Sequence, residues 1–267
     1  QSDVVLAVLG ESAEMSGESS SRSNIEMPQA QKDLLKALLK TGKPVVLVLF
    51  TGRPLALTWE QQNVPAILNV WFGGSEAGYA VADVLFGDVN PSGKLSMTFP
   101  QNVGQVPLFY NHKNTGRPLA EGKWFEKFRS NYLDVSNDPL YPFGYGLSYT
   151  NFSYSDVRIS NASPKGNQTI TASVTLTNDG AVTGKEVVQL YIRDVVGSVT
   201  RPVKELKGFQ KVELKAGESK TVSFNITAND LKFYNYDLKY DWEAGDFHIM
   251  IGANSRDVKM AKLSWSK

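Results

Sequence analysis

Val4-Val5-Leu6-Ala7-Val8-Leu9 runs directly into the polar stretch Gly10-Glu11-Ser12-Ala13-Glu14-Met15-Ser16-Gly17-Glu18-Ser19-Ser20-Ser21-Arg22. A short, continuous apolar run is typical of a parallel β-strand that is covered on both faces. Two further apolar runs lie at 45–50 and 66–71, and leucines at helical spacing separate the first two runs. A second helical pattern over 77–85 ends at Gly87. This alternation predicts a parallel sheet with right-handed crossovers.

The last third of the chain has a different period. Apolar residues alternate with polar ones at Ile170, Ala172, Val174 and Leu176, and turn signals at 178–180, 215–217 and 244–246 separate such segments. Alternating strands at this spacing predict a β-sandwich. Because the chain has no cysteine pair, a fibronectin type III-like domain is favoured over an immunoglobulin domain.

The predicted fold class is therefore α/β plus all-β. We expect a partial parallel-sheet α/β sandwich domain over 1–100 and a fibronectin type III-like β-sandwich over 151–267. Residues 101–150 are rich in Gly, Pro, Asn and aromatic residues with little periodicity, which indicates a connector.

Composition excludes several classes of protein. The 267 residues carry a formal net charge of +1, so no strong field favours nucleic acid or an anionic membrane. No apolar run approaches the roughly 20 residues that span a bilayer. The absence of cysteine removes disulfides and thiolate chemistry. The chain begins without a methionine and enters an apolar run at once, so we expect it to be a fragment of a longer protein.

Familiar catalytic motifs are incomplete. Residues 73–77 resemble a nucleophile elbow but end in alanine, and residues 87–94 resemble a phosphate loop with one residue too many. Leu95 replaces the hydroxyl residue that would hold magnesium. His112 and His248 are the only histidines and lie far apart in sequence, so neither a histidine triad nor a zinc site is expected. We expect no cofactor and no metal.

Carboxylates remain as candidates for chemistry. Ligand sites in open α/β sheets lie beyond the carboxyl ends of the strands, and the loop after the first strand carries Glu11, Glu14, Glu18 and Arg22. These residues form a candidate site at that edge. The alternative interpretation is a solvated polar loop.

Five segments together resemble glycoside hydrolase family 3, in particular its bacterial periplasmic β-glucosidases. They are Ser16-Gly17-Glu18 with Arg22, residues 71–78 (WFGGSEAG), 86–95 (FGDVNPSGKL), 141–150 (YPFGYGLSYT) and 201–209 (RPVKELKGF). The resemblance implies a TIM-like barrel with an aspartate nucleophile, then an α/β sandwich with the acid/base glutamate, then a fibronectin type III-like domain. This sequence contains no barrel, so independent activity is not expected.

The resemblance also assigns roles within the loop. It implies that Glu18 is the general acid/base of a retaining β-glucosidase, with Glu14 as a rival and Glu11 as a weaker one. Arg22 matches the family's basic residue after the glutamate, which implies sugar binding or loop orientation. The alternative for Arg22 is an ion pair with a neighbouring glutamate. We assign Arg22 and Glu14 to substrate binding.

The implied setting is a periplasmic or secreted enzyme acting on terminal β-linked glucosides or oligosaccharides. Its partner would be the upstream barrel of the same protein, and neither nucleic acid nor a membrane span is expected. The alternative function is a non-catalytic module that binds carbohydrate or protein or braces the structure. Tyr234 and Tyr236 are candidates for such binding, although packing in the core or at an edge is the favoured interpretation for both.

Overall fold

The structure, a computed structural model, describes residues 2–119 and 123–267, which form two compact units. The first unit holds the chain up to Val89 together with Met97–Leu108 and Tyr132–Tyr141. The second holds the remaining segments, of which Pro142–Lys267 is the largest. The chain thus passes between the units several times in the segment that the sequence marks as a connector. The division at residues 100 and 150 stays a prediction.

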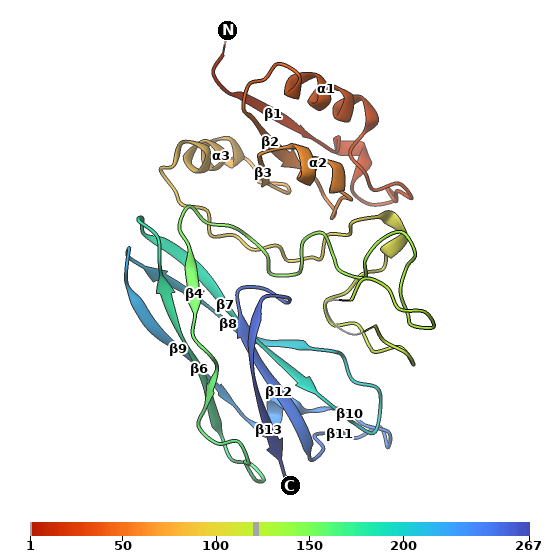
Figure 1. The fold of residues 1–267 in the computed structure, drawn as a ribbon, viewed down its shortest axis with the longest axis vertical. Helices are drawn as coiled ribbons and strands as arrows, with labels where there is room; N and C mark the ends of the chain where they lie inside the picture. Colours follow the sequence, from red (N-terminus) through yellow and green to blue (C-terminus); the bar gives the residue numbers. More distant parts are fainter. Residues whose placement is uncertain (1, 120–122) are drawn as a thin grey trace. The chain divides into compact units, whose positions relative to one another are not determined.

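The first unit is built on a three-stranded parallel sheet (Figure 1). The order is β1 (Val5–Gly10), β2 (Val45–Phe50) and β3 (Ala66–Asn69). The central strand β2 is almost entirely buried, because both of its edges are paired and its apolar side chains are covered. The parallel sheet predicted from the apolar runs is confirmed.

The expectation that β1 is covered on both faces is wrong. Ala7 is buried, whereas Leu6 and Val8 on the other face are 46% and 61% exposed. The reason is the position of β1 at the edge of the sheet, where α1 (Gln29–Leu39) packs beside it (Figure 1). A strand with one face on a helix and one face open has the alternating burial of a half-buried strand despite its uniform sequence.

Two more helices belong to the first unit. The six-residue α2 (Thr58–Asn63) lies between β2 and β3, and α3 (Ala77–Phe86) follows β3. As expected, α3 ends at Gly87, which has the left-handed backbone (φ 85°) of a helix C-cap. Two short 3-10 helices, η1 (Ala13–Met15) and η2 (Val103–Gln105), complete this unit.

The second unit is an antiparallel β-sandwich with one four-stranded sheet ordered β13-β12-β7-β8. In the facing sheet, β6 pairs with β4, β5 and β9 (Figure 1). The bounds are β4 (Phe152–Tyr154), β5 (Arg158–Ile159), β6 (Ile170–Asn178), β7 (Gly184–Asp194), β8 (Glu205–Leu214), β9 (Ser219–Ile226), β12 (Gly245–Gly252) and β13 (Val258–Trp265). The 3-10 helix η3 (Ala228–Leu231) leads into a small hairpin of β10 (Phe233–Tyr234) and β11 (Tyr240–Asp241).

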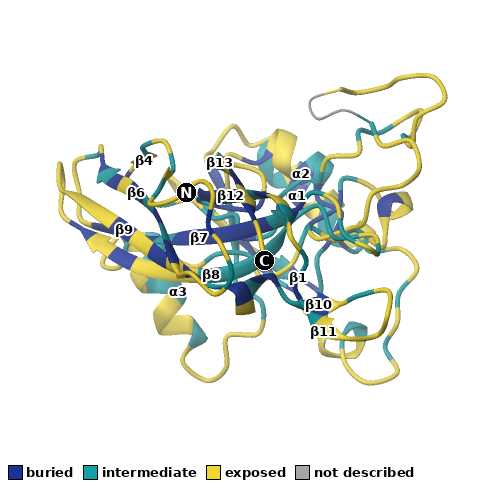
Figure 2. Cartoon of the chain, turned by 90° about the horizontal axis from the view of Figure 1, so that it is seen from below, coloured by how far each residue is buried: buried dark blue, intermediate teal, exposed yellow. Residues whose placement is uncertain are grey.

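Alternation places the sandwich core between the sheets. Ile170, Ala172, Val174 and Leu176 of β6 are buried, as is most of β7 (Figure 2). The α/β plus all-β fold class is confirmed. The third turn signal is displaced, because Gly245 already belongs to β12. Within the described ranges, no helix is long and apolar enough to cross a membrane.

Candidate active site

The candidate site begins where β1 and β2 end together. The parallel register pairs Gly10 with Phe50, so Glu11 and Thr51 are the first residues beyond neighbouring strand ends. Gly10 has φ 147°, and a Cβ atom there would overlap the carbonyl oxygen of Phe50. The side chain of Gln31 accepts a hydrogen bond from the Gly10 N–H at 2.6 Å and donates one to its carbonyl at 2.7 Å. The exit from β1 is therefore fixed by a close backbone approach that only glycine permits.

Glu11 lies at the centre of the site. Its side chain is fully buried, and its Oε1 lies 2.8 Å from Arg22 Nη1 and 2.9 Å from Arg53 Nε. The Thr51 hydroxyl donates to Oε2 at 2.8 Å, and the Gly52 amide donates to the same oxygen at 3.2 Å. Both carboxylate oxygens are thus occupied.

These contacts set the charge state of Glu11. Burial raises the pKa of the Glu11 carboxyl, but the hydrogen bonds from Arg22, Thr51 and Gly52 and the charge of Arg53 outweigh burial and lower the pKa below its ordinary value. Glu11 is therefore an ionised anchor for two cations rather than a proton donor.

Arg53 connects this anchor to the loop. Its Nη2 donates to the carbonyl oxygens of Met15 and Ser20, the latter at 2.9 Å. These two carbonyls bracket the segment that carries Glu18. Arg22 extends the network, since its Nη2 donates to the carbonyl of Glu26 at 3.1 Å.

The loop between those carbonyls has a constrained backbone. Gly17 has φ 141°, and Ser19 adopts φ 59°, a left-handed conformation that non-glycine residues rarely adopt. Ser16 packs so closely on Gly52 that a Cβ atom at Gly52 would overlap the Ser16 hydroxyl. Glu18 itself is exposed, so its carboxyl is accessible to a ligand.

Two of the predicted site residues are exposed on the loop, and a third is partly buried in an ion pair. Glu18 and Glu14 are exposed, the latter within η1. Arg22 is half-buried and paired with Glu11, the ion pair that the sequence left open as an alternative. Sequence reasoning missed Arg53. The available signal was its place in Thr51-Gly52-Arg53, directly after the second predicted strand.

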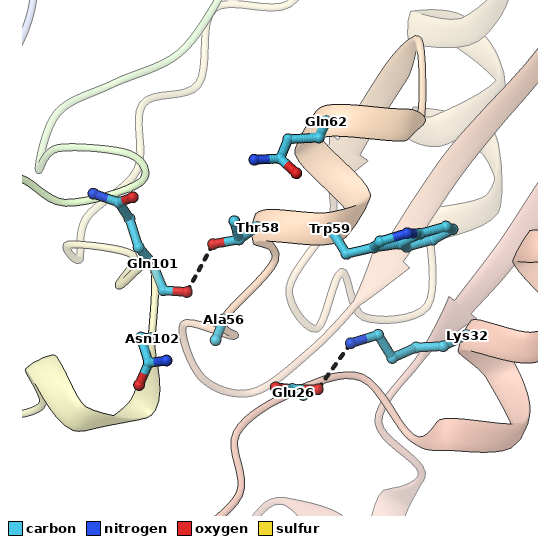
Figure 3. A pocket seen from close by; sticks show the side chains of 8 residues that line it. All are labelled: Glu26, Lys32, Ala56, Thr58, Trp59, Gln62, Gln101 and Asn102. Atoms are coloured by element: carbon cyan, nitrogen blue, oxygen red, sulfur yellow. Dashed lines mark hydrogen bonds and ion pairs between the residues drawn. The ribbon is translucent and has the colours of Figure 1, made fainter. Parts of the chain in front are cut away.

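A polar cavity of about 290 Å³ lies in the same unit. Figure 3 shows its lining, which comprises Glu26, Lys32, Ala56, Thr58, Trp59, Gln62, Gln101 and Asn102. Lys32 Nζ lies 2.8 Å from Glu26 and 3.8 Å from Glu60, so it bridges an exposed carboxylate and a buried one. Burial raises the pKa of Glu60, whose oxygens have no hydrogen-bond partner among the described residues.

Comparison with known proteins places these features in a family. Residues 1–149 match the glycosyl hydrolase family 3 C-terminal domain, and residues 186–255 match a fibronectin type III-like domain. The chain is 56% identical over 259 residues to a periplasmic beta-glucosidase of Salmonella typhimurium, covering 97% of this chain and 34% of that protein. It is 46% identical over 265 residues to a beta-xylosidase of Formosa agariphila, covering 98% and 36%.

Solved structures agree. The beta-glucosidase of Listeria innocua in complex with glucose superposes with a TM-score of 0.93 and 44% identity, covering 99% of this chain and 37% of that one. The chain thus spans about a third of the length of the relatives it matches. Since the first match alone covers more than half of the residues, the chain belongs to glycoside hydrolase family 3.

Proposed function

We propose that this chain supplies the acid/base half of the active site of a retaining β-glucosidase, with Glu18 as the acid/base. The observation that supports the proposal most directly is an exposed carboxyl on a loop whose main chain is bound by Arg53, an arginine paired with the buried carboxylate of Glu11. The names of the relatives, which are beta-glucosidases and a beta-xylosidase, support the reaction class. The nucleophile would come from the TIM-like barrel of the full-length protein, so the chain alone would be inactive.

The chemistry needs two carboxyl groups about 5–5.5 Å apart. In the first step the barrel carboxylate bonds to the anomeric carbon, the glycosidic C–O bond breaks, and the Glu18 proton passes to the leaving oxygen. In the second step water attacks the anomeric carbon, the bond to the carboxylate breaks, and the water proton returns to Glu18. An exposed carboxyl on a loop whose main chain is bound at Met15 and Ser20 suits both proton transfers.

The other roles follow from the same arrangement. Glu14 lies on the same loop as Glu18, and we propose that it binds the substrate. Arg22 is proposed to share this role, since 20% of its side chain stays exposed while it pairs with Glu11. We also propose a periplasmic or secreted location, supported by the named location of the Salmonella relative.

The experiment joins this chain to the preceding residues of the Salmonella relative and measures hydrolysis of aryl β-glucosides and β-xylosides. Glu18→Gln should lower kcat by about 10²–10⁴-fold for poor leaving groups, because general acid catalysis contributes about that much. Substrates with a highly acidic leaving group should lose much less in the first step. Azide, which needs no general base, should restore turnover of such substrates by forming a glycosyl azide.

A matched variant separates the two candidate carboxylates. Glu14→Gln should raise KM with little change in kcat, since a binding residue acts on ground and transition states alike. Loss of kcat in Glu14→Gln with azide rescue, and its retention in Glu18→Gln, would transfer the acid/base role to Glu14. Activity of the chain alone would overturn the placement of the nucleophile in the barrel.

A second candidate function rests on the β10–β11 hairpin. Tyr234 and Tyr236 are 68% and 79% exposed, so they do not pack in a core, whereas packing at an edge is compatible with their place in or beside this two-stranded hairpin. Tyr240 is 59% exposed, and its ring centroid lies 5.1 Å from that of Tyr234. We propose this surface as a carbohydrate-binding platform, since exposed aromatic faces combine an apolar body with a polar tip. Retarded migration of the chain in polysaccharide gels, lost in Tyr234→Ala/Tyr236→Ala, would support it.

A further inference from the structure

We propose that Glu11 is a positioning residue for catalysis: its buried carboxylate, acting through Arg22 and Arg53, holds the loop that presents Glu18. This inference rests on the proposed acid/base role of Glu18. It assigns a function to a glutamate that does not itself reach the substrate.

The burial of Glu11 needs an explanation. An ionised carboxylate is costly to remove from water unless its oxygens are paired and hydrogen-bonded. Here Arg22 and Arg53 approach one oxygen at 2.8 and 2.9 Å, while Thr51 and Gly52 occupy the other. Arg53 Nε makes an ionic contact there without hydrogen-bond geometry, whereas Arg22, Thr51 and Gly52 donate hydrogen bonds. Such a cluster resists movement, because displacing an arginine would leave the buried Glu11 carboxylate without part of its compensation.

The rigidity passes to Glu18 through Arg53. With Nε held beside Glu11, the planar guanidinium directs Nη2 toward the carbonyls of Met15 and Ser20. A guanidinium presents its donors in a fixed fork, so fixing one edge fixes the direction of the other. The chain between these carbonyls is only four residues long and includes Glu18.

Arg22 fixes the far side of the loop. It contacts Glu11 through Nη1 and the Glu26 carbonyl through Nη2. The Glu11 carboxylate therefore holds the following segment in two places. Arg53 connects it to the carbonyls of Met15 and Ser20, and Arg22 connects it to the carbonyl of Glu26. Close packing of Ser16 on Gly52 adds a contact that resists displacement of the loop.

The first test measures loop mobility in the chain itself. The amides of Met15 and Ser20 donate hydrogen bonds within the loop, to the carbonyls of Ser12 and Gly17, so their hydrogen exchange reports its opening. Glu11→Gln keeps the shape but removes the charge, and Arg53→Lys keeps the charge but loses the fork. In both variants we expect exchange at these amides to accelerate at least about tenfold, which is about 1.4 kcal/mol.

Controls make the result interpretable. Amides of β2 should keep their protection, which shows that the fold is intact. Glu213→Gln breaks an exposed ion pair with Lys185 in the other unit and should change nothing in the loop. If Glu11→Gln fails to fold, hydrogen exchange of the loop amides in Arg53→Lys tests the proposal instead. Unchanged loop exchange in the folded variants would overturn the proposal.

The second test measures catalysis in the protein joined to the barrel of the Salmonella relative. Glu11→Gln and Arg53→Lys should lower kcat by about 10–100-fold with little change in KM, because a displacement of about 1 Å at a catalytic group can cost 10²-fold. Guanidinium added to Arg53→Ala, at concentrations that leave β2 protected, should restore part of both kcat and loop protection.

The two tests separate this inference from the proposed function. A loosened loop with unchanged kcat would overturn the positioning role, while a lowered kcat in Glu18→Gln would still support Glu18 as the acid/base. Full activity of Glu18→Gln would instead overturn the acid/base assignment. The proposal that Glu11 positions Glu18 for catalysis would then also fail.

Discussion

Lys94 Nζ lies 3.0 Å from a carboxylate oxygen of Glu186, and only 11% and 4% of the two side chains are exposed. Lys94 also donates to the carbonyl of Gly146 at 2.7 Å, and the Tyr154 hydroxyl donates to the other Glu186 oxygen at 3.1 Å. The lysine that resembles a phosphate-loop residue in sequence is thus part of a buried network in the second unit.

Removing the lysine should be costly. We expect Lys94→Met to lower the free energy of unfolding of the second unit by about 3–5 kcal/mol, because it leaves a buried carboxylate without its cation. Lys185→Met is the matched control, since Lys185 pairs with Glu213 at 3.2 Å on the surface. That change should cost no more than about 1 kcal/mol. Urea unfolding followed through the amides of β6 and β7 measures both, and equal losses would contradict the importance of burial.

The same network predicts a pH dependence. Burial raises the pKa of Glu186, although Lys94 and Tyr154 oppose the change. Between the ordinary carboxyl pKa of about 4.3 and this raised value, the folded state keeps a proton that the unfolded state has released. The unfolding free energy should therefore fall as pH rises through that window, by about 1.4 kcal/mol for each pH unit between the unfolded and the folded pKa.

Comparison with Glu186→Gln isolates this contribution. The glutamine cannot titrate, so the stability of the variant relative to the wild type should improve as pH rises from about 4 through the raised pKa of Glu186. Other carboxyl groups titrate in both proteins and cancel in the difference. A difference that stays constant with pH would show that Glu186 has no raised pKa.

Glu11 should give the opposite slope. Its pKa is lowered, since the hydrogen bonds and the arginine charges outweigh burial. Its stabilisation is complete above about 4.3 and is lost as pH falls through the lower folded pKa. The stability advantage of the wild type over Glu11→Gln, measured through β2 protection and thermal unfolding, should therefore narrow under acid. An advantage that widens below about pH 4 would contradict this sign.

Much of the fold was predictable because burial follows the period of the sequence. The alternation in β6 is reproduced as alternating burial, and the apolar run of β2 as a covered central strand. The run that became β1 looks the same in sequence, yet Leu6 and Val8 are exposed. Strand order decides that difference, and periodicity does not report strand order. The six-residue α2 was missed because Thr58–Asn63 is too short and polar to show an apolar stripe.

The candidate site was predictable only in part. Its location at the carboxyl end of the first strand follows from α/β topology. The pairing of Glu11 with two arginines was not predictable, since a polar loop residue beside Glu14 and Glu18 carries no local mark of burial. Its burial depends on Arg53, which arrives from the neighbouring strand end. Which side chains meet between two loops depends on the direction in which each side chain points. The pattern of residue types along the sequence does not give that direction.

The exit from β1 provides a last, stringent prediction. A Cβ atom at Gly10 would overlap the Phe50 carbonyl oxygen and lie 2.6 and 2.8 Å from the Phe50 carbonyl carbon and nitrogen. These are backbone atoms, so Gly10→Ala must separate the ends of β1 and β2 and weaken the 2.8 Å hydrogen bond from the Glu11 amide to Phe50. We expect a loss of about 1–3 kcal/mol in the first unit, as for overpacking, with faster exchange at the Glu11 amide.

Gly78→Ala is the matched control for this change. Gly78 lies on the exposed side of α3, and an added Cβ atom there meets nothing within 4 Å. Alanine at an unstrained helical position should stabilise the first unit by about 0.5–1 kcal/mol, because it reduces the backbone entropy of the unfolded chain. Opposite signs for the two substitutions in urea unfolding, followed through β2, would establish that the strand exit requires glycine. A neutral Gly10→Ala would mean that β1 and β2 can separate at no cost, and that Glu11 is not held where its contacts require.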